Sequence, residues 1–359
     1  GLPLVRRRMR LYNRPMNSRN KIGLAIVFAG MSLSVFGGHL KLVSNPYAGV
    51  DWDSVTQHKA NLHTHTVASG GHLFLRQAYE EYARNGYTVL AVTDHNLCTE
   101  WGKSDIDPLK EFGILQVKGQ EFSDSQHVSG LFVHRVKHTK NIQNLLKNVG
   151  HDEGLAILNH PGRYWIPGVN GMVPPDTLTR YRSLFSENPC LLGLEVINAN
   201  SFFKHDIDLW DSLLGVFMPE RPVWGFANDD MHKASQIAKG WEVLLLDALN
   251  EKEVRSVMTT GSYYFSARSP TMSQRFEHEP PVIISLAHDS TARTLHVTAA
   301  ADGEVLGSGH YRWLAEGRTI GEGSVLDYGK LELSLCYVRA EISSQGGTTY
   351  TNPFGFMPD

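Results

Sequence analysis

Two histidines, His63 and His65, lie two residues apart in the segment A-N-L-H-T-H-T-V-A-S, which runs from Ala60 to Ser69. The residues after Lys59 alternate in character and predict a β-strand, in which side chains at positions i and i+2 point to the same face. Two neutral imidazoles on one face supply half of the ligands of a metal site. An isolated pair of this kind is more often a pair of surface or otherwise bonded histidines, so the metal interpretation depends on the rest of the chain.

Four more groups of histidine or acidic residues follow, each where a predicted strand ends. Imidazole nitrogen and carboxylate oxygen are both common metal ligands. A site at the mouth of a barrel is built from residues at the carboxyl ends of different strands. The four groups are T-D-H-N (Thr93–Asn96), G-Q-E (Gly119–Glu121), N-H-P (Asn159–Pro161) and D-M-H (Asp230–His232).

The composition is that of an ordinary globular protein, with 359 residues, of which 42% are hydrophobic and 20% charged. This length leaves room for one large domain and a smaller one. The net charge of -3 gives no basic field, so a nucleic-acid partner is not expected. The three cysteines, Cys98, Cys190 and Cys336, are far apart, which indicates neither a disulfide framework nor a cysteine-based zinc site. Any metal should have nitrogen and oxygen ligands.

The first 40 residues have the pattern of a signal anchor or of a signal peptide with a long basic head. Residues 1–21 contain seven basic residues and no acidic one, and Ile22–Leu40 carries no charged residue over about the length that spans a bilayer. Because the basic residues precede the apolar run, the rest of the chain is expected on the exocytoplasmic side of a membrane. The alternative is a buried N-terminal helix of the soluble fold. Residues 41–57 are predicted to be a linker.

Residues 58–268 alternate short apolar runs with amphipathic stretches, which predicts repeated βα units and a parallel sheet. Six or seven units, with candidate ligands at the ends of many strands, favour a TIM-like barrel over an open sheet. The expected helices are Leu73–Asn85, Asn141–Asn148, Pro175–Glu187, Asp206–Phe217 and one that begins after Asn250 and ends near Gly261. The expected strands include Thr88–Val92, Leu155–Leu158, Leu192–Ile197 and Pro222–Phe226.

A second, smaller domain is predicted after a proline-containing linker at 269–281. Residues 282–359 contain short alternating runs separated by glycine and aspartate, which indicates a β-sandwich of the immunoglobulin-like type. The expected strands are Val282–Leu286, Thr294–Ala299, His310–Ala315, Leu331–Leu335 and Tyr337–Ile342.

The ordered set H-x-H, T-D-H-N, G-x-E, N-H-P and D-x-H resembles the polymerase and histidinol phosphatase (PHP) family of metal-dependent phosphoesterases. The resemblance covers about 58–268, and the tail from Tyr337 to Pro353 resembles the β-domain that often follows this barrel. The resemblance implies a distorted (β/α)7 barrel with two or three divalent ions, commonly Zn, Mn or Fe, at its mouth.

The resemblance also assigns roles to individual residues. It implies that His63 and His65 hold one ion, that His95 holds another, and that Glu121 bridges ions through its two oxygens. The metal ligands are completed by His160, Asp230 and His232, and the catalytic group is Glu121 with Asp230 and His232. Asp94 is expected either to hold the far nitrogen of an imidazole or to be a turn residue.

Two positions depart from the family pattern. The family has a further histidine after the G-x-E motif, for which His127 is preferred to His134 because it precedes the next predicted strand. The family also has S-D-G after H-x-H, whereas this chain has Ser69, Gly70 and Gly71. Either His72 replaces the missing acid as a metal ligand or the third metal site is lost or weakened.

Substrate contacts are less constrained by the motifs. Arg163, two residues after N-H-P, would either clamp a phosphate bidentately or pair with a nearby acid. Glu195 and Asn198 end another strand and are assigned no role. The expected activity is hydrolysis of a small-molecule phosphate mono- or diester by a metal-activated water. The alternatives are hydrolysis of a carbamate or carboxylic ester, as in the carbaryl-hydrolase-like branch that the chain also resembles, and a noncatalytic ligand-binding module.

Overall fold

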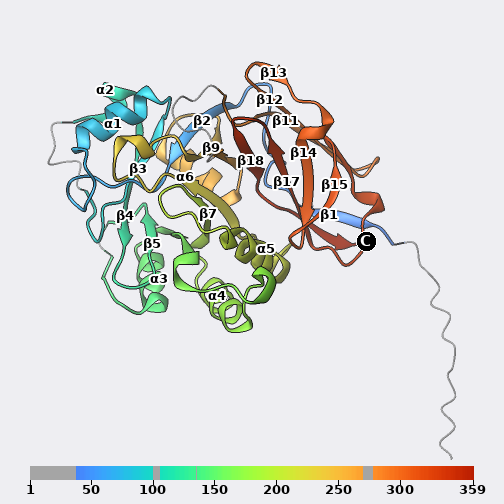
Figure 1. Ribbon diagram of the computed structural model, residues 1–359, viewed down its shortest axis with the longest axis horizontal. Coiled ribbons are helices and arrows are strands. Elements are labelled where there is room, and N and C mark those ends of the chain that lie inside the picture. Colours follow the sequence, from blue (N-terminus) through green and yellow to red (C-terminus); the bar gives the residue numbers. More distant parts are fainter. Residues whose placement is uncertain (1–37, 100–105, 135, 270–277) are drawn as a thin grey trace, which may run out of the picture. The chain divides into compact units, whose positions relative to one another are not determined.

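The computed structural model describes residues 38–99, 106–134, 136–269 and 278–359 (Figure 1). The predicted signal anchor lies outside these residues except for its last three, and Leu40 already begins strand β1 (Leu40–Ser44). Residues 41–57 were expected to form a linker, but β1 pairs with the last strand of the chain, β19 (Phe354–Pro358). In the described part of the chain, no helix is long and apolar enough to cross a membrane.

Eight strands form the row that carries the predicted barrel, in the order β9-β2-β3-β4-β5-β6-β7-β8. Four neighbouring pairs are parallel, namely β2–β3, β3–β4, β6–β7 and β7–β8. The strands are β2 (Thr56–Asn61), β3 (Val89–Val92), β4 (Leu115–Phe122), β5 (Val128–Leu131), β6 (Leu155–Leu158), β7 (Leu191–Asn198), β8 (Trp224–Asn228) and β9 (Gly240–Leu246). The architecture is therefore a mixed α/β, TIM-like fold with an additional β region.

The expectation of a wholly parallel barrel is wrong for two strands. β5 is antiparallel to β4 and β6, and β9 is antiparallel to β2 and to β10 (Tyr263–Arg268). For β5 the reason is the length of its connection to β4, because a parallel pair needs a crossover of a dozen or more residues. Only residues 123–127 separate β4 from β5.

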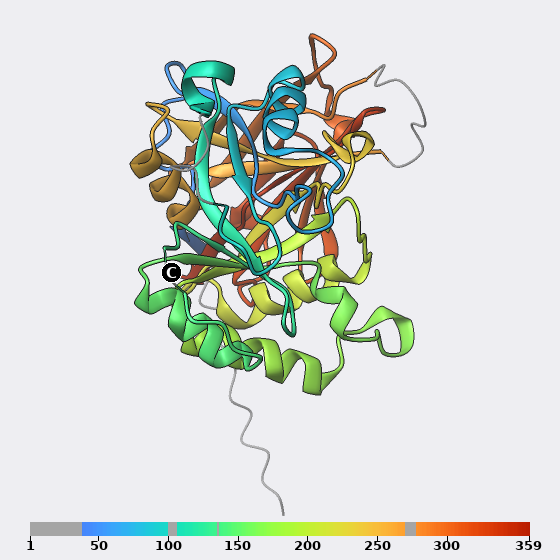
Figure 2. The ribbon, with the colours of Figure 1, turned by 90° about the vertical axis from the view of Figure 1, so that its left-hand side faces the viewer.

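Among the described residues, six α-helices connect the strands, and the five that were expected are present. They are α1 (Leu75–Arg84), α2 (Pro108–Phe112), α3 (Ile142–His151), α4 (Pro175–Glu187), α5 (His205–Phe217) and α6 (Glu251–Thr260). Their ends follow local chemistry: the Asn250 side chain accepts a hydrogen bond from the backbone N–H of Glu253, and Gly261 ends α6 in the left-handed conformation. Helices α3, α4 and α5 lie along one side of the strand row (Figures 1 and 2).

Side chains rather than a backbone ladder join the two ends of the strand row. Within the described chain, β8 forms a ladder with β7 but none with β9. Instead, the buried Glu242 of β9 accepts a hydrogen bond from the backbone N–H of Ala227 at 3.1 Å. The Asn228 side chain accepts one from the N–H of Leu62 on the other side at 2.7 Å. Buried polar side chains therefore satisfy backbone groups that a closed ladder would satisfy.

The C-terminal strands form two sheets that enclose apolar side chains such as Val297 and Trp313. One sheet contains β11 (Val282–Asp289), β12 (Thr294–Ala301), β13 (Glu304–Val305) and β16 (Val325–Asp327). The other contains β14 (Tyr311–Ala315), β15 (Arg318–Glu322), β17 (Tyr337–Ser343), β18 (Gly347–Thr351) and β19, with β1. The segment Leu331–Leu335, expected to be a strand, is not one.

The second of these sheets continues the sheet of the barrel strands. β18 pairs antiparallel with β10 over five residue pairs, from Tyr264 with Thr351 to Arg268 with Gly347. A buried ion pair adds to this junction, because the Arg339 guanidinium of β17 donates two hydrogen bonds of 2.8 Å to Asp211 of α5. Residues Gly38–Asp359 accordingly form one compact unit, and the predicted boundary at 269–281 is not a break in the hydrogen-bonded sheet.

Candidate metal centre

The Glu121 carboxylate, near the end of β4, is the centre of the site. Its side chain is buried, and nitrogen atoms of five histidines lie within 3.5 Å of its oxygens. One carboxylate cannot accept five well-formed hydrogen bonds, so hydrogen bonds to Glu121 alone do not explain why all five nitrogens converge there. The distances from Oε1 are 3.3 Å to His63 Nε2, 2.9 Å to His127 Nδ1 and 3.5 Å to His160 Nε2, and those from Oε2 are 3.3 Å to His65 Nε2 and 2.8 Å to His95 Nδ1.

Asp230, which follows β8, is the second carboxylate. Its Oδ1 lies 3.3 Å from His63 Nε2 and 3.2 Å from His65 Nε2. Its Oδ2 accepts hydrogen bonds from the side-chain amides of Asn198 at 3.3 Å and Asn200 at 3.4 Å. The carboxylate is therefore fixed on one side by amides and presents its other oxygen to two imidazoles.

These residues form four overlapping groups in which three potential ligand atoms lie within 4.8 Å of one another. Neighbouring ions that share ligands require overlapping groups of this kind. The groups are His63 with His65 and Asp230, His63 with Glu121 and His160, His95 with Glu121 and His127, and His65 with His95 and His232. All eight residues were expected to be metal ligands from the sequence.

The fold brings most of these residues together at or just after the carboxyl ends of different strands. His127 instead precedes β5, whose antiparallel direction places its amino end beside the carboxyl end of β4. His63 and His65 lie just beyond β2 rather than on it, held there by a bridge between Thr64 and Met231. Two of the ligands have backbone conformations that are rare for residues other than glycine, with φ of 30° at His160 and 48° at Asp230. Such conformations cost about 1–3 kcal/mol each and gather at functional sites.

Glu195 of β7 orients His63, a role that the sequence did not reveal. The His63 Nδ1–H donates to Glu195 Oε1 at 2.8 Å, which leaves the Nε2 lone pair of the neutral ring for a metal ion. The other oxygen, Oε2, accepts hydrogen bonds of 2.8 Å from the backbone N–H of His160 and from the Asn198 amide. An acidic residue within the fully buried strand Leu191–Asn198 was the signal that could have indicated this role.

Asp94 acts on His65 indirectly rather than by holding an imidazole itself. Its carboxylate accepts hydrogen bonds from Ser69 Oγ at 2.6 Å and from the backbone N–H and Oγ1 of Thr66 at 2.7 and 2.8 Å. The Ser69 hydroxyl oxygen in turn lies 3.2 Å from His65 Nδ1 and can accept a hydrogen bond from the Nδ1–H. The pair therefore leaves the Nε2 of His65 directed toward the two carboxylates.

Asn159 holds Glu121 in place. Its side-chain amide donates to Glu121 Oε1 at 2.8 Å and to Ser129 Oγ at 3.0 Å, and its carbonyl oxygen accepts from the Ser129 backbone N–H. Both hydrogens of the amide are thus used, which fixes its orientation. In the N-H-P motif, the asparagine as well as the histidine therefore serves the site.

The histidines and carboxylates shift one another's pKa values. Burial raises the pKa of Glu121, but the neighbouring imidazoles outweigh it and hold this pKa well below its usual range. Burial is outweighed in the same way at Asp230, whose pKa is lowered. Burial lowers the pKa of His63 and His65, but the carboxylates raise both above the usual value. Both acids are therefore anionic at neutral pH and demand a positive partner, which protons or metal cations can supply.

The donor atoms fit divalent metal ions. His95 Nδ1 and Glu121 Oε2 are buried and lie 2.8 Å apart, yet they are not aligned as donor and acceptor, and neither has a hydrogen-bond partner. Buried polar atoms without a partner are rare in folded proteins. A cation between two lone pairs would satisfy both, and a set of imidazole and carboxylate ligands suits Zn, Mn or Fe.

Three other candidate residues lie apart from these groups. The His72 side chain is exposed and belongs to none of the metal-ligand groups of the described residues, although its backbone N–H donates to the His232 carbonyl at 2.6 Å. His134 is also exposed, with its Nδ1 3.4 Å from Lys118 Nζ. Arg163 is exposed on the 3-10 turn Pro161–Tyr164 and has no ion pair with a carboxylate of the described chain.

No protein-family model matches the sequence, and no curated protein matches it. Several solved structures are similar to this chain, among them the following three. A two-domain protein from Bacteroides vulgatus, described as containing a predicted PHP-like metal-dependent phosphoesterase, is 16% identical, with a TM-score of 0.48 over 87% of this chain and 99% of that one. An amidohydrolase from Chromobacterium violaceum is 14% identical, with a TM-score of 0.40 over 48% of this chain and 87% of that one.

The third structure, from Bifidobacterium adolescentis, is assigned as a metal-dependent phosphoesterase. It is 13% identical, with a TM-score of 0.40 over 56% of this chain and 96% of that one.

Proposed function

We propose that the protein is a metal-dependent hydrolase of the PHP type that cleaves phosphate mono- or diesters. The observation that carries this proposal is the buried Glu121 carboxylate with five imidazole nitrogens within 3.5 Å. Protons alone would leave several of these nitrogens facing one another, as do the Nε2 atoms of His63 and His65 at 3.1 Å. Shared cations would satisfy all of them at once.

The overlapping ligand groups support two or three divalent ions of Zn, Mn or Fe. His63, His65 and Asp230 would hold one ion, and His95 with His127 would hold another, with Glu121 shared between ions. His160 and His232 lie at the two ends of the cluster and would complete the coordination of their neighbours. His72 belongs to none of these groups. The first two ions would therefore not need His72 as a replacement for the acid that this chain lacks.

Divalent ions held here would supply an activated water and polarise the phosphoryl oxygens. The protein's own residues fix the positions of the ligands. Glu195 and Ser69 hold the far nitrogens of His63 and His65, and Asn198 and Asn200 hold Asp230. Arg163, exposed three residues after His160, is available to bind a phosphate bidentately.

We also propose that the N-terminal segment attaches the protein to a membrane or directs its export, with the catalytic part on the exocytoplasmic side. The support is the run of basic residues before the uncharged segment Ile22–Leu40. The proposed substrate is a small-molecule phosphate ester, and a nucleic-acid partner is not expected from the net charge of -3.

Metal content and substrate class test the proposal directly. The purified full-length protein, supplied in turn with Zn, Mn and Fe, is expected to retain at least two metal equivalents and to hydrolyse an aryl phosphate monoester or diester. Parallel assays would use a carboxylic ester and a carbamate of the same aryl alcohol. Less than one metal equivalent would refute the metal centre, whereas turnover of only the ester or carbamate would refute the phosphate specificity and leave the hydrolase.

A further inference from the structure

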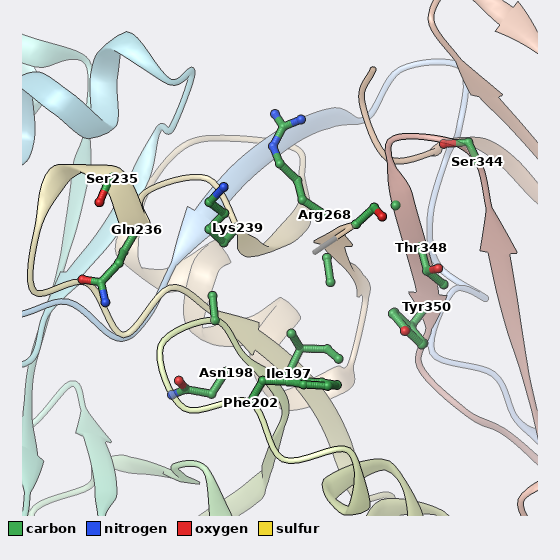
Figure 3. A pocket seen from close by; sticks show the side chains of 14 residues that line it. Ile197, Asn198, Phe202, Ser235, Gln236, Lys239, Arg268, Ser344, Thr348 and Tyr350 are labelled. Atoms are coloured by element: carbon green, nitrogen blue, oxygen red, sulfur yellow. The ribbon is translucent and has the colours of Figure 1, made fainter. Parts of the chain in front are cut away.

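A cavity of about 470 Å³ lies between the barrel strands and the C-terminal sheet. Its lining comes from four parts of the chain: the end of β7 and the loop after it, residues 235–239 between β8 and β9, the end of β10, and the strand β18 with the turn before it. Figure 3 shows Asn198 and Gln236 on the side of the cavity opposite Thr348 and Tyr350. Pockets of this volume hold small organic ligands, and a phosphate group alone would leave most of it unfilled.

The cavity shares a wall with the metal centre. Asn198 lines the cavity, and its side-chain amide donates to Asp230 Oδ2 at 3.3 Å. Gln236 also lines it, and its Oε1 accepts from the backbone N–H of His232 at 2.8 Å. The Gln236 amide further donates to the Asn200 carbonyl oxygen, which joins these two walls. A molecule in the cavity would therefore lie beside the Asp230 and His232 side of the centre.

The lining favours an uncharged group. Apolar surface is supplied by Ile197, Phe202, Ala267 and Tyr350. Two cations line the cavity, Lys239 and Arg268. The Arg268 guanidinium donates to both Glu279 oxygens at 2.6 and 2.7 Å and to two backbone carbonyl groups, so its charge is compensated. Lys239 is not without a partner either, so a carboxylate or a second phosphate would have to compete with existing contacts for both cations.

Phe202 is the clearest sign that the cavity is a binding site. Its side chain is 56% exposed although it lies on the cavity wall. On the opposite wall, the Tyr350 ring is 8% exposed and stacks on Phe265 with ring centroids 5.1 Å apart and planes at 8°. One ring is thus free to cover a ligand, whereas the other is a fixed surface, and aromatic walls of this kind suit a planar apolar group.

The C-terminal strands are needed to build this wall. β18 lies on β10 at Gly347, where a Cβ atom would stand 2.0 Å from the Ala267 carbonyl oxygen and where φ is +150°. Only glycine fits this close approach. It sets β18 directly against the end of β10, and Thr348 and Tyr350 follow on the same strand.

We infer that this cavity binds the uncharged, apolar or aromatic part of the substrate while the metal centre binds its phosphate. The inference rests on the proposed phosphoesterase function and extends it to a substrate class: organic phosphates with a planar apolar group, rather than phosphates of small polar alcohols. It also gives the C-terminal β region a role, because that region supplies one wall of the site.

Binding of two non-hydrolysable phosphonates tests the inference. The metal-supplemented full-length protein should bind 1-naphthylmethylphosphonate about tenfold or more tightly than methylphosphonate, because only the former carries a group for the cavity. Phe202→Ala should reduce this ratio at least threefold, and Ser235→Trp, which places a bulky ring at an exposed position of the cavity rim, should reduce it further. Phe74→Ala, which removes a 64% exposed aromatic ring that does not line the cavity, should leave it unchanged.

A ratio near one in the wild-type protein, no binding of either phosphonate, or an unchanged ratio in both cavity variants would overturn the inference. Hydrolysis of 1-naphthyl phosphate by the same preparations distinguishes a failure of this inference from a failure of the proposed function. Turnover together with a phosphonate binding ratio near one would refute the role of the cavity and leave the phosphoesterase activity. Selective binding without turnover of any phosphate ester would support the cavity and refute the activity.

Discussion

The strongest test of how the metal centre is organised is the substitution Glu195→Gln. The Glu195 carboxylate accepts three hydrogen bonds of 2.8 Å, from His63 Nδ1, from the His160 backbone N–H and from the Asn198 amide. A glutamine has the same shape but only one oxygen, and its NH2 group must face a donor in either orientation. If the NH2 faces His63, that ring must move its proton to Nε2, the atom that would bind the metal.

If the NH2 instead faces His160 and Asn198, two hydrogen bonds to a charged acceptor are lost, at about 1.5–3 kcal/mol each. In both orientations the position or the lone pair of a ligand is compromised. Loss of a residue that orients a metal ligand lowers metal affinity about 10–100-fold, which corresponds to about 1.4–2.7 kcal/mol. We therefore expect metal affinity to fall by this amount, measured by competition with a chromophoric chelator on folded protein.

The matched control is Glu242→Gln, on the neighbouring strand β9. Glu242 is equally buried, and burial raises its pKa well above the usual range, which favours the protonated form that an amide resembles. Its Oε1 accepts only the Ala227 N–H, a bond that glutamine preserves, and its Oε2 has no partner. Wild-type metal affinity in Glu195→Gln, or an equal loss in both variants, would refute the orienting role.

Four further predictions follow from particular contacts. Glu121→Gln should reduce phosphate ester turnover at least about a thousandfold, because the hydroxide-generating chemistry needs both ions; circular dichroism should show an intact fold, and near-wild-type initial rates would contradict the shared-ligand role. His72→Ala should change turnover less than about twofold, since this side chain is exposed and outside the ligand groups; a large loss that excess metal rescues would restore it as a ligand. Arg339→Met should destabilise the fold by about 3–5 kcal/mol in urea unfolding, because Asp211 would be left charged and unpaired, and no change would contradict this. Asp206 is buried, and burial raises its pKa to about 8. Its folded form therefore holds a proton that the unfolded form has lost between about pH 4 and 8. Stability should therefore fall over this range in the wild type relative to Asp206→Asn, which should be more stable at pH 8 by more than about 1 kcal/mol; parallel pH profiles of the two proteins would exclude the effect.

Local chemistry was sufficient to predict much of the fold. Helix α4 has the predicted bounds Pro175–Glu187, since proline begins it and apolar spacing continues through it. Strand direction was less accessible, because it depends on connection length as well as on apolar runs. The pairing of β1 with β19 joins the two ends of the described chain, and no short window of sequence contains that information.

The sequence predicted the metal ligands that lie in short motifs. It did not predict the side chains that orient those ligands. Histidines and acids at strand ends identified the eight residues that the structure groups together. Glu195 serves His63 across 132 residues of sequence, and Ser69 and Asn159 act through hydroxyl and amide groups that are common anywhere on a surface. The second layer of contacts around a metal centre is therefore what the sequence alone conceals.

The continuity of the sheet from β10 into β18 has a practical consequence for dividing the chain. A protein ended at Arg268 would expose the whole edge of β10, whose five residue pairs with β18 would lose their partners. Unpaired, largely apolar edges of this kind recruit other strands and lead to aggregation. The barrel and the C-terminal strands are therefore expected to fold as one unit, and a fragment that ends at Arg268 is expected to self-associate.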